Sequence, residues 1–168
     1  MQNKDILAKK QEEVVIAIDP GFDRLGIAIL ARDPKKHKVV FSECFNTDKK
    51  LTFEERLVLL GTHLEKTIKK YTPNSLAIET LFLSNNKKTV MHVAEVRGVI
   101  IYICKKNGID VFEYNPNSVK VAVTGYGGAT KENVMAMVPR LVDFEKIPSS
   151  DDELDAVAIG LTHLASVK

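Results

Sequence analysis

Three short apolar runs open the sequence, and each is followed by residues typical of turns. Residues 14–18 (VVIAI) are continuously apolar and stop at an Asp-Pro-Gly sequence beginning at Asp19, which is typical of a buried central strand and a tight turn. The runs at residues 26–30 and 39–45 follow after short connections. We therefore predict three consecutive strands, of which the first two form an antiparallel hairpin.

The rest of the chain alternates between segments of helical periodicity and further apolar runs. Thr52 with Glu55, and Ser150 with Glu153, match the capping box that starts many helices. Apolar residues recur at spacings of three and four after Thr52, as on the buried face of a helix. The predicted elements after the first three strands are a helix over residues 53–70, a strand over 75–79, a helix over 87–106, a strand over 110–114, and three helices over 117–124, 131–142 and 151–166.

This order of elements predicts an α/β fold in which helices flank a five-stranded mixed sheet. A right-handed crossover through the helix over 53–70 makes the first and fourth strands parallel neighbours. Residues 13–168 contain no internal repeat and no low-complexity linker, and we expect them to form a single domain. Residues 1–12 are polar, and we expect a flexible leader there.

The composition is that of an ordinary globular protein. Of 168 residues, 45% are hydrophobic and 27% are charged, and 24 Lys and Arg against 22 Asp and Glu give a net charge of +2. This balance excludes a polybasic tail protein, but it is compatible with a local basic groove for nucleic acid. Cys44 and Cys104 lie in apolar segments and are expected to be reduced core thiols.

The hydropathy pattern gives no sign of a membrane protein. No apolar run approaches the roughly 20 residues that span a bilayer. The first residues, MQNKDILAKKQEE, contain no apolar signal region. We therefore expect a cytoplasmic protein without a membrane partner.

Four acidic residues are the strongest candidates for chemistry. Asp19 and Glu79 each follow an apolar strand, and parallel neighbouring strands end at the same edge of a sheet. Asp152 and Asp155 are three residues apart at the start of the last helix, so they share a face of that helix. The helix turns apolar after Asp155, which predicts that its body packs on the sheet while its first turn reaches the same edge.

A cluster of four carboxylates is costly unless a cation is bound, because like charges repel. Mg²⁺ prefers carboxylate and water oxygens, and two such ions about 4 Å apart can activate a water for attack on a phosphodiester. Each acid is also compatible with a simpler role. Asp152 and Asp155 would favour the helix dipole, Asp19 could cap a turn, and Glu79 could be an exposed charge at a strand end.

Six segments of the sequence resemble the RuvC family of Holliday-junction resolvases. They are IAIDPGFDRLGIAIL, AIETLF, VAEVRGVI, VFEYNPNSVK, GGATKENV and DELDAVAIGLTH, and they occur in the family's order. The resemblance implies a ribonuclease H-like fold and a homodimer. It also implies a metal-dependent, structure-selective endonuclease that resolves four-way DNA junctions by paired nicks during recombination and DNA repair.

The resemblance further implies cofactors and a protein partner. The cofactor would be Mg²⁺, two ions per active site, with Mn²⁺ as a substitute. Association with the RuvA–RuvB branch-migration complex is implied as well, although some relatives act without it.

The family's functional residues carry over to matching positions of this chain. The four metal-binding catalytic acids fall on Asp19, Glu79, Asp152 and Asp155, whereas Asp151 and Glu153 match no catalytic position and are interpreted as helix-start charges. Matching catalytic lysines are Lys120 and Lys131, and the implied DNA-binding residues are Phe82, Asn85, Lys87, Lys88, Arg97, Lys120 and Lys131.

Some of these positions are also compatible with a purely structural role. Phe82, between Leu81 and Leu83, would be a core aromatic in most proteins, whereas the family aromatic stacks on a junction base. The two lysines could belong to solvated helix faces. Leu25 stands where the family usually has Thr, so local DNA contacts and the sequence preference of the cut are not carried over.

The helix over residues 89–106 matches the family's dimer helix. Its apolar residues exceed what one core-facing stripe requires, which predicts a second buried face in a dimer. The alternative is a helix enclosed within its own domain.

Three other functions remain compatible with these residues. A different ribonuclease H-like enzyme could use the same acids on linear DNA or RNA, and a catalytically silent protein could bind junctions. An actin-like ATPase or sugar kinase also places an Asp-x-Gly turn between early strands, but such a fold needs two lobes.

Overall fold

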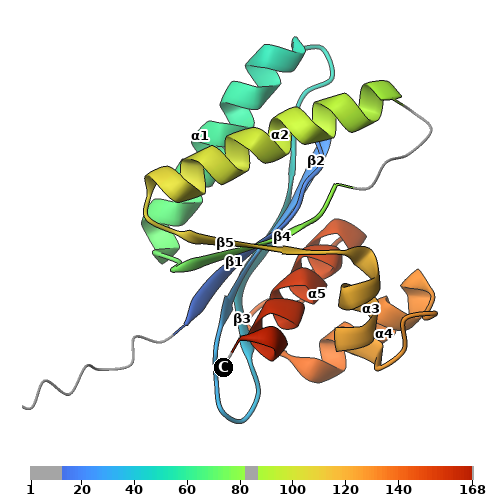
Figure 1. Ribbon diagram of the computed structural model, residues 1–168. Helices are drawn as coiled ribbons and strands as arrows, with labels where there is room; N and C mark the ends of the chain where they lie inside the picture. Colours follow the sequence, from blue (N-terminus) through green and yellow to red (C-terminus); the bar gives the residue numbers. More distant parts are fainter. Residues whose placement is uncertain (1–12, 82–86, 168) are drawn as a thin grey trace, which may run out of the picture.

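The computed structural model describes residues 13–81 and 87–167, with the side chain of Lys87 left out (Figure 1). Residues 1–12, the expected leader, lie outside this description. The elements, in chain order, are β1 (Val14–Asp19), β2 (Arg24–Ala31), β3 (Lys38–Asn46), α1 (Phe53–Tyr71), β4 (Ser75–Glu79), α2 (Lys87–Lys106), β5 (Asp110–Tyr114), α3 (Pro116–Thr124), α4 (Lys131–Leu141), β6 (Asp143–Phe144) and α5 (Asp151–Ser166).

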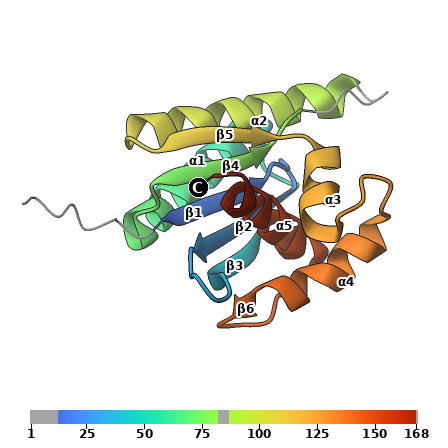
Figure 2. The same ribbon diagram turned by 60° about the horizontal axis from the view of Figure 1, so that its bottom comes forward.

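The elements form three layers with a mixed sheet in the middle. Its strand order is β5-β4-β1-β2-β3-β6. Helices α1 and α2 cover one face, and α3, α4 and α5 cover the other (Figures 1 and 2). The predicted α/β architecture is confirmed, and every predicted helix and strand is present with small differences at the ends.

The predicted number of strands is wrong, because the described sheet has six rather than five. The additional strand, β6, contains only Asp143 and Phe144 and pairs in parallel with Lys38 and Val39 at the edge of the sheet. Two residues are too few to carry an alternating pattern, so the sequence gives no signal for this strand.

β1 lies at the centre of the sheet, with all of its inner residues buried. It pairs in parallel with β4, in the register Ile18 to Ile78, and antiparallel with β2, in the register Asp19 to Gly26. The predicted crossover through α1 is therefore confirmed. It brings the carboxyl ends of β1 and β4 together at one edge of the molecule.

The two faces of the sheet carry side chains of different size. Ile16, Ile18 and Ile78 pack towards α1 and α2, whereas Ala17 and Ala77 pack towards α5. These small residues allow α5 to approach the sheet closely. Gly160 of α5 lies where an added Cβ would overlap Leu30 Cδ1 and come within 3.1 Å of Ala17 Cβ.

Helix α5 is fixed to the rest of the fold near its last turn. The fully buried His163 has Nε2 3.0 Å from Glu13 Oε1 and Nδ1 2.9 Å from the Tyr114 hydroxyl. Burial lowers the pKa of His163, so its ring is neutral at pH 7 and both nitrogens take part in hydrogen bonds. Arg32 donates to Glu13 Oε2 at 2.6 Å, which connects this network to β2.

The two predicted capping boxes have different outcomes. At α1, Thr52 Oγ1 accepts from the Glu55 amide at 3.3 Å and Glu55 Oε2 accepts from the Thr52 amide at 2.8 Å, so the box is complete. At α5, Ser150 Oγ accepts from the Glu153 amide at 3.4 Å, but the Glu153 carboxylate does not return to the Ser150 amide. Only the first half of the second box is therefore present.

The cysteines and the helices bear on two further expectations. Cys104 is buried and Cys44 is half-buried, and neither forms a disulfide, so the expectation of a core thiol is wrong for Cys44. Within residues 13–81 and 87–167, no helix has the length and apolar character needed to cross a membrane.

Candidate active site

The four acids predicted from the sequence converge at one edge of the sheet. Asp19 ends β1, Glu79 ends β4, and Asp152 and Asp155 lie at the start of α5, as its second and fifth residues. Gly26, opposite Asp19 on β2, makes this approach possible. An added Cβ there would overlap the backbone oxygen of Asp152 and lie 3.2 Å from Asp19 Cβ.

The pKa values show that these carboxylates share one electrostatic environment. Burial, followed by repulsion from Asp155, Glu79 and Asp152, raises the pKa of Asp19 to about 7. Burial is also the main cause that raises the pKa of Glu79, with Asp155 adding to it. Burial likewise raises the pKa of Asp155. The cluster is therefore costly to ionise, which a nearby cation would relieve.

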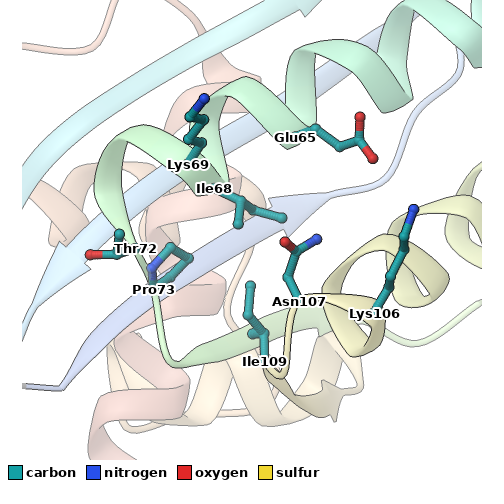
Figure 3. A pocket seen from close by; sticks show the side chains of 8 residues that line it. All are labelled: Glu65, Ile68, Lys69, Thr72, Pro73, Lys106, Asn107 and Ile109. Atoms are coloured by element: carbon teal, nitrogen blue, oxygen red, sulfur yellow. The ribbon is translucent and has the colours of Figure 1, made fainter.

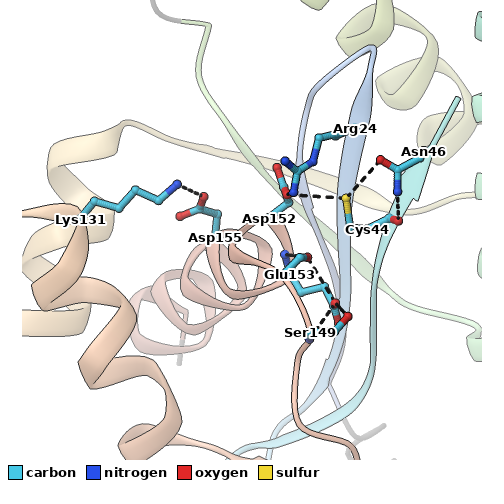
Figure 4. Close-up of polar contacts among 9 residues, drawn as sticks. Arg24, Cys44, Asn46, Lys131, Ser149, Asp152, Glu153 and Asp155 are labelled. Carbon is cyan, nitrogen blue, oxygen red and sulfur yellow. Dashed lines mark hydrogen bonds and ion pairs between the residues drawn. The ribbon is translucent and has the colours of Figure 1, made fainter. Parts of the chain in front are cut away.

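Two basic side chains neutralise part of this charge (Figure 4). Lys131 Nζ, at the start of α4, lies 2.8 Å from Asp155 Oδ2. Its hydrogen bond to Asp155 raises the pKa of Lys131, so the lysine stays charged. The exposed Arg24 of β2 forms an ion pair with Asp152, whose Oδ2 also accepts a weak hydrogen bond from Cys44 Sγ at 3.6 Å.

The donor chemistry fits a hard divalent cation, although the acids are not drawn together around one position. Among the described residues, no three His, Cys, Asp or Glu side chains are spaced to hold a metal ion. Asp152 and Asp155 instead face Arg24 and Lys131. Carboxylate oxygens on three elements, in a site where burial and mutual repulsion raise the pKa of Asp19, are nevertheless the ligand set suited to Mg²⁺.

Glu153 anchors the turn that carries Asp152 and Asp155. It is 5% exposed, and its carboxylate accepts hydrogen bonds from Ser42 Oγ at 2.6 Å and from the Ser149 amide and hydroxyl at 3.0 and 2.8 Å. Burial alone would raise the pKa of Glu153, but these hydrogen bonds hold it below the usual value. Glu153 is thus the helix-start charge expected from the sequence, and it is at the same time a buried link between α5 and β3.

Of the other predicted site residues, one lies in the acid cluster, and the rest lie on other helices or outside the described residues. Lys131 lies in the acid cluster, whereas the half-buried Lys120 lies on α3, a helix that packs on α5. Lys88 is exposed in the first turn of α2. Phe82, Asn85 and the side chain of Lys87 lie outside the described residues.

Arg97 does not fit the prediction of a DNA contact. Its residue is 8% exposed, and its guanidinium donates to the backbone carbonyl of Glu79 and, at 2.6 Å, to Glu113 Oε2. A buried side chain whose guanidinium is bound to Glu79 and Glu113 does not present a free charge to DNA. The prediction is therefore corrected to an internal contact with the end of β4.

Two hollows lie at opposite ends of the sheet. One, of about 300 Å³, borders the acid cluster and includes Arg24, Cys44 and Glu153 in its walls. The other, of about 520 Å³, lies near the start of β4, whereas Glu79 ends that strand. It is lined by Pro73 and by the last residues of α1 and α2 (Figure 3). The first is lined by Arg24 and Cys44, which contact Asp152, but by none of the four acids themselves.

Comparison with known proteins identifies the family. The model of the family "Crossover junction endodeoxyribonuclease RuvC" matches residues 15–163, a range that includes all four acids, Lys120 and Lys131. The chain belongs to the RuvC family.

Curated RuvC relatives cover most of this chain. The crossover junction endodeoxyribonuclease RuvC of Brachyspira hyodysenteriae is 43% identical over 150 residues, covering 89% of this chain and 92% of the relative. The RuvC of Fusobacterium nucleatum is 42% identical over 153 residues, covering 91% of this chain and 80% of the relative.

Solved structures of RuvC agree with the fold. Thermus thermophilus RuvC in complex with a Holliday junction substrate is 28% identical with a TM-score of 0.83, over 90% of this chain and 92% of that one. The yeast mitochondrial Holliday junction resolvase is 14% identical with a TM-score of 0.68, which is a likeness of fold alone. The predicted ribonuclease H-like fold is therefore confirmed.

Proposed function

We propose that this chain is a structure-selective endonuclease that resolves four-way DNA junctions by paired nicks during recombination and repair. The observation that carries the proposal is the acid cluster at the ends of β1 and β4, completed by the first turn of α5, in a chain of the RuvC family. The names of its relatives and the junction complex of the Thermus thermophilus protein support the same substrate.

Asp19, Glu79, Asp152 and Asp155 are the residues that would hold Mg²⁺, in two positions, with Mn²⁺ as a substitute. When bound, divalent ions supply polarisation of the phosphate and activation of water. Burial, together with repulsion from the other three acids, raises the pKa of Asp19 to about 7. Asp19 is therefore the acid whose ionisation depends most on a neighbouring cation.

Lys131 is the positive group closest to the acids on the α4 side. It is 2.8 Å from Asp155 and belongs to the exposed mouth of the cluster, where a phosphate approaching the acids would meet it. A lysine there can hold the scissile phosphate or offset developing negative charge. We assign the same role to Lys120 on the resemblance alone.

Base stacking and backbone contacts complete the proposed DNA site. An aromatic side chain after Glu79, at the position of Phe82, would stack on an unpaired junction base, which is worth roughly 1–3 kcal/mol. The residues proposed to contact the DNA backbone are Asn85, Lys87, Lys88, Lys120 and Lys131.

A homodimer fits the two cuts that a nearly symmetric junction requires. The outer face of α2 carries an apolar stripe that the single chain leaves exposed, including Met91 at 64% and Tyr102 at 65% exposure. A second copy would cover it. A cytoplasmic location and cooperation with a RuvA–RuvB complex belong to this proposal as well.

A magnesium-dependent assay on synthetic DNA tests the function. The protein is incubated with a fixed four-way junction, a mobile four-way junction, linear duplex and an RNA–DNA hybrid, and the products on all strands are mapped. We expect symmetric nicks with 5′-phosphate ends on the junctions only. Equal cleavage of duplex or hybrid would favour a different ribonuclease H-like nuclease, and junction binding without cleavage would favour a silent binding protein.

A further inference from the structure

The guanidinium of Arg97 connects the helix with the exposed apolar stripe to the end of the strand that carries Glu79. Nη1 donates to the Glu79 carbonyl and Nη2 donates to Glu113 Oε2 at 2.6 Å. The Arg97 side chain is 9% exposed, whereas the Glu113 side chain is 46% exposed, so the contact with the Glu79 carbonyl is the better shielded of the two. A single side chain of α2 therefore contacts β4 and β5 at their neighbouring carboxyl ends.

The contact lies where the ordinary sheet pairing between β4 and β5 stops. Glu79 is opposite Tyr114, the last residue of β5, and the Thr80 amide donates to the Tyr114 carbonyl at 2.8 Å. A strand end has fewer backbone partners than a strand centre. The side chain of Arg97 thus supplies a hydrogen bond to the residue whose carboxylate must face the other acids.

We propose that Arg97 is a positioning residue that fixes the end of β4 so that the Glu79 carboxylate faces Asp19 and Asp155. The proposal rests on the proposed function in that Glu79 is a cation ligand of the nuclease site. It replaces the expectation that Arg97 contacts DNA.

Two properties of the contact distinguish it from a general packing role. Arginine presents a planar fork whose separate nitrogens reach two acceptors at once, whereas all the donors of lysine lie on a single nitrogen. The acceptors lie on different strands, β4 and β5. Holding both ends in register therefore requires the fork rather than the charge alone.

The chain offers a matched control. Lys105, also on α2, lies 3.1 Å from Asp110 Oδ1 of β5, and both side chains are more than half exposed. This pair joins the same two elements as Arg97 and Glu113, but at the opposite end of β5. Lys105→Gln therefore removes a link between α2 and β5 without touching the acid cluster.

The first measurement is hydrogen exchange of the Thr80 amide in the full chain, with chelator present and without DNA. Arg97→Gln should raise the Thr80 exchange rate about tenfold or more, because local opening at the strand end becomes easier. Arg97→Lys should give a smaller increase. Lys105→Gln, and the amide of Ile16 in β1 as an internal reference, should not change.

The second measurement is the concentration of Mg²⁺ or Mn²⁺ that raises Tm by a fixed amount in the absence of DNA, from which the affinity for the metal is obtained. Residues that orient a ligand to a metal typically contribute 10–100-fold to its affinity, so Arg97→Gln should need about tenfold more metal or higher. Arg97→Lys, which is the variant more certain to fold, should fall between Arg97→Gln and the parent. Lys105→Gln should respond as the parent does.

The two measurements separate the possible outcomes. Unchanged Thr80 exchange in Arg97→Gln and Arg97→Lys overturns the proposal. Faster exchange with a parental metal requirement also overturns it, because Arg97 would then be structural only. If the parent protein neither responds to metal nor cleaves junctions, the proposed function fails, and the role of Arg97 in positioning a metal ligand fails with it. The Thr80 exchange rates would then still report whether Arg97 stabilises the end of β4.

Discussion

At the scale of single residues, Asp19 combines burial with the repulsion of three neighbouring acids. Its half-buried carboxyl lies among three other acids, and its pKa is raised to about 7 from an ordinary value of 3.8. An acid whose pKa is higher in the folded than in the unfolded protein binds more protons in the fold. Proton binding by Asp19 therefore adds to the free energy of unfolding at low pH. This contribution is lost as the pH rises from about 4 to about 7.

Asp19→Asn tests this cost together with the catalytic role. Without divalent metal, the variant should be more stable than the parent by about 1–3 kcal/mol at pH 8, since each unit of pKa shift corresponds to about 1.4 kcal/mol and screening reduces the full value. Near pH 4 the difference should disappear. Chemical denaturation at both pH values measures it.

The same variant should bind junction DNA but fail to cleave it. Its cleavage rate should be at least about a hundredfold below that of the parent, because the acid nearest the centre of the cluster is gone. A variant that cuts at the parental rate, or that gains no stability at pH 8, would contradict the assignment of Asp19.

Some site residues could be found from the sequence, and others could not. Asp19 and Glu79 were predictable because each ends an apolar run, and Asp155 because it precedes the apolar body of a helix. Arg24 and Glu153 were not, because their partners Asp152 and Ser42 are 128 and 111 residues away in the chain. Periodicity describes local structure and carries no information about such long-range pairs.

At the scale of elements, the approach of α5 to the hairpin of β1 and β2 sets the spacing of the acids. Gly26 is the closest point of that approach, since an added Cβ would overlap the backbone oxygen of Asp152. The overlap is with backbone rather than with a flexible side chain, so a larger residue must move the start of the helix.

Gly26→Ala should therefore reduce cleavage far more than it reduces stability. We expect a loss of about 1–3 kcal/mol in the free energy of unfolding, as for other overpacked sites. The displaced turn should lower the cleavage rate by about a hundredfold, a scale reached when reacting groups move by about 1 Å. Urea denaturation and single-turnover cleavage of a junction measure the two effects, and a proportionate loss in both would contradict a displaced helix start.

The prediction of elements succeeded where patterns were long and failed where they were short. Helix α1 follows its periodicity closely and begins at a complete capping box. β6 escaped prediction because it has two residues, and the second capping box was only half right because Ser42 of a distant strand competes for the Glu153 carboxylate. Tertiary contacts decided both cases.

At the scale of the whole molecule, α2 has one face inside the domain and one outside. Ile100 and Cys104 are buried against the domain core, whereas Met91 and Tyr102 are more than 60% exposed. The alternative that α2 is enclosed within its own domain is thus not supported by the single chain. An exposed apolar stripe of this kind often marks a protein interface.

A double substitution, Met91→Glu with Tyr102→Glu, tests the dimer. If two copies meet through this stripe, buried like charges should shift the protein to a monomer in sedimentation experiments. Paired nicks should fall by about tenfold or more, since two sites must act on one junction. Leu141→Glu, at the end of α4 on the other side of the sheet, is the control and should change neither property.

A parental protein that sediments as a monomer would contradict the dimer directly. If the double variant remains a dimer, the interface must lie on a surface other than this stripe of α2. Neither result would affect the cleavage chemistry of the acid cluster in one copy.

The anchoring of α5 near both ends has a consequence for how the protein takes up ions. Ser42 and Ser149 hold Glu153 in the first turn, and Glu13 and Tyr114 hold His163 near the last. The crowded carboxylates therefore cannot separate by a retreat of the helix. If a cation binds among these carboxylates as proposed, its capture should displace the proton that burial and the neighbouring acids keep on Asp19, so the affinity for the ion should rise with pH.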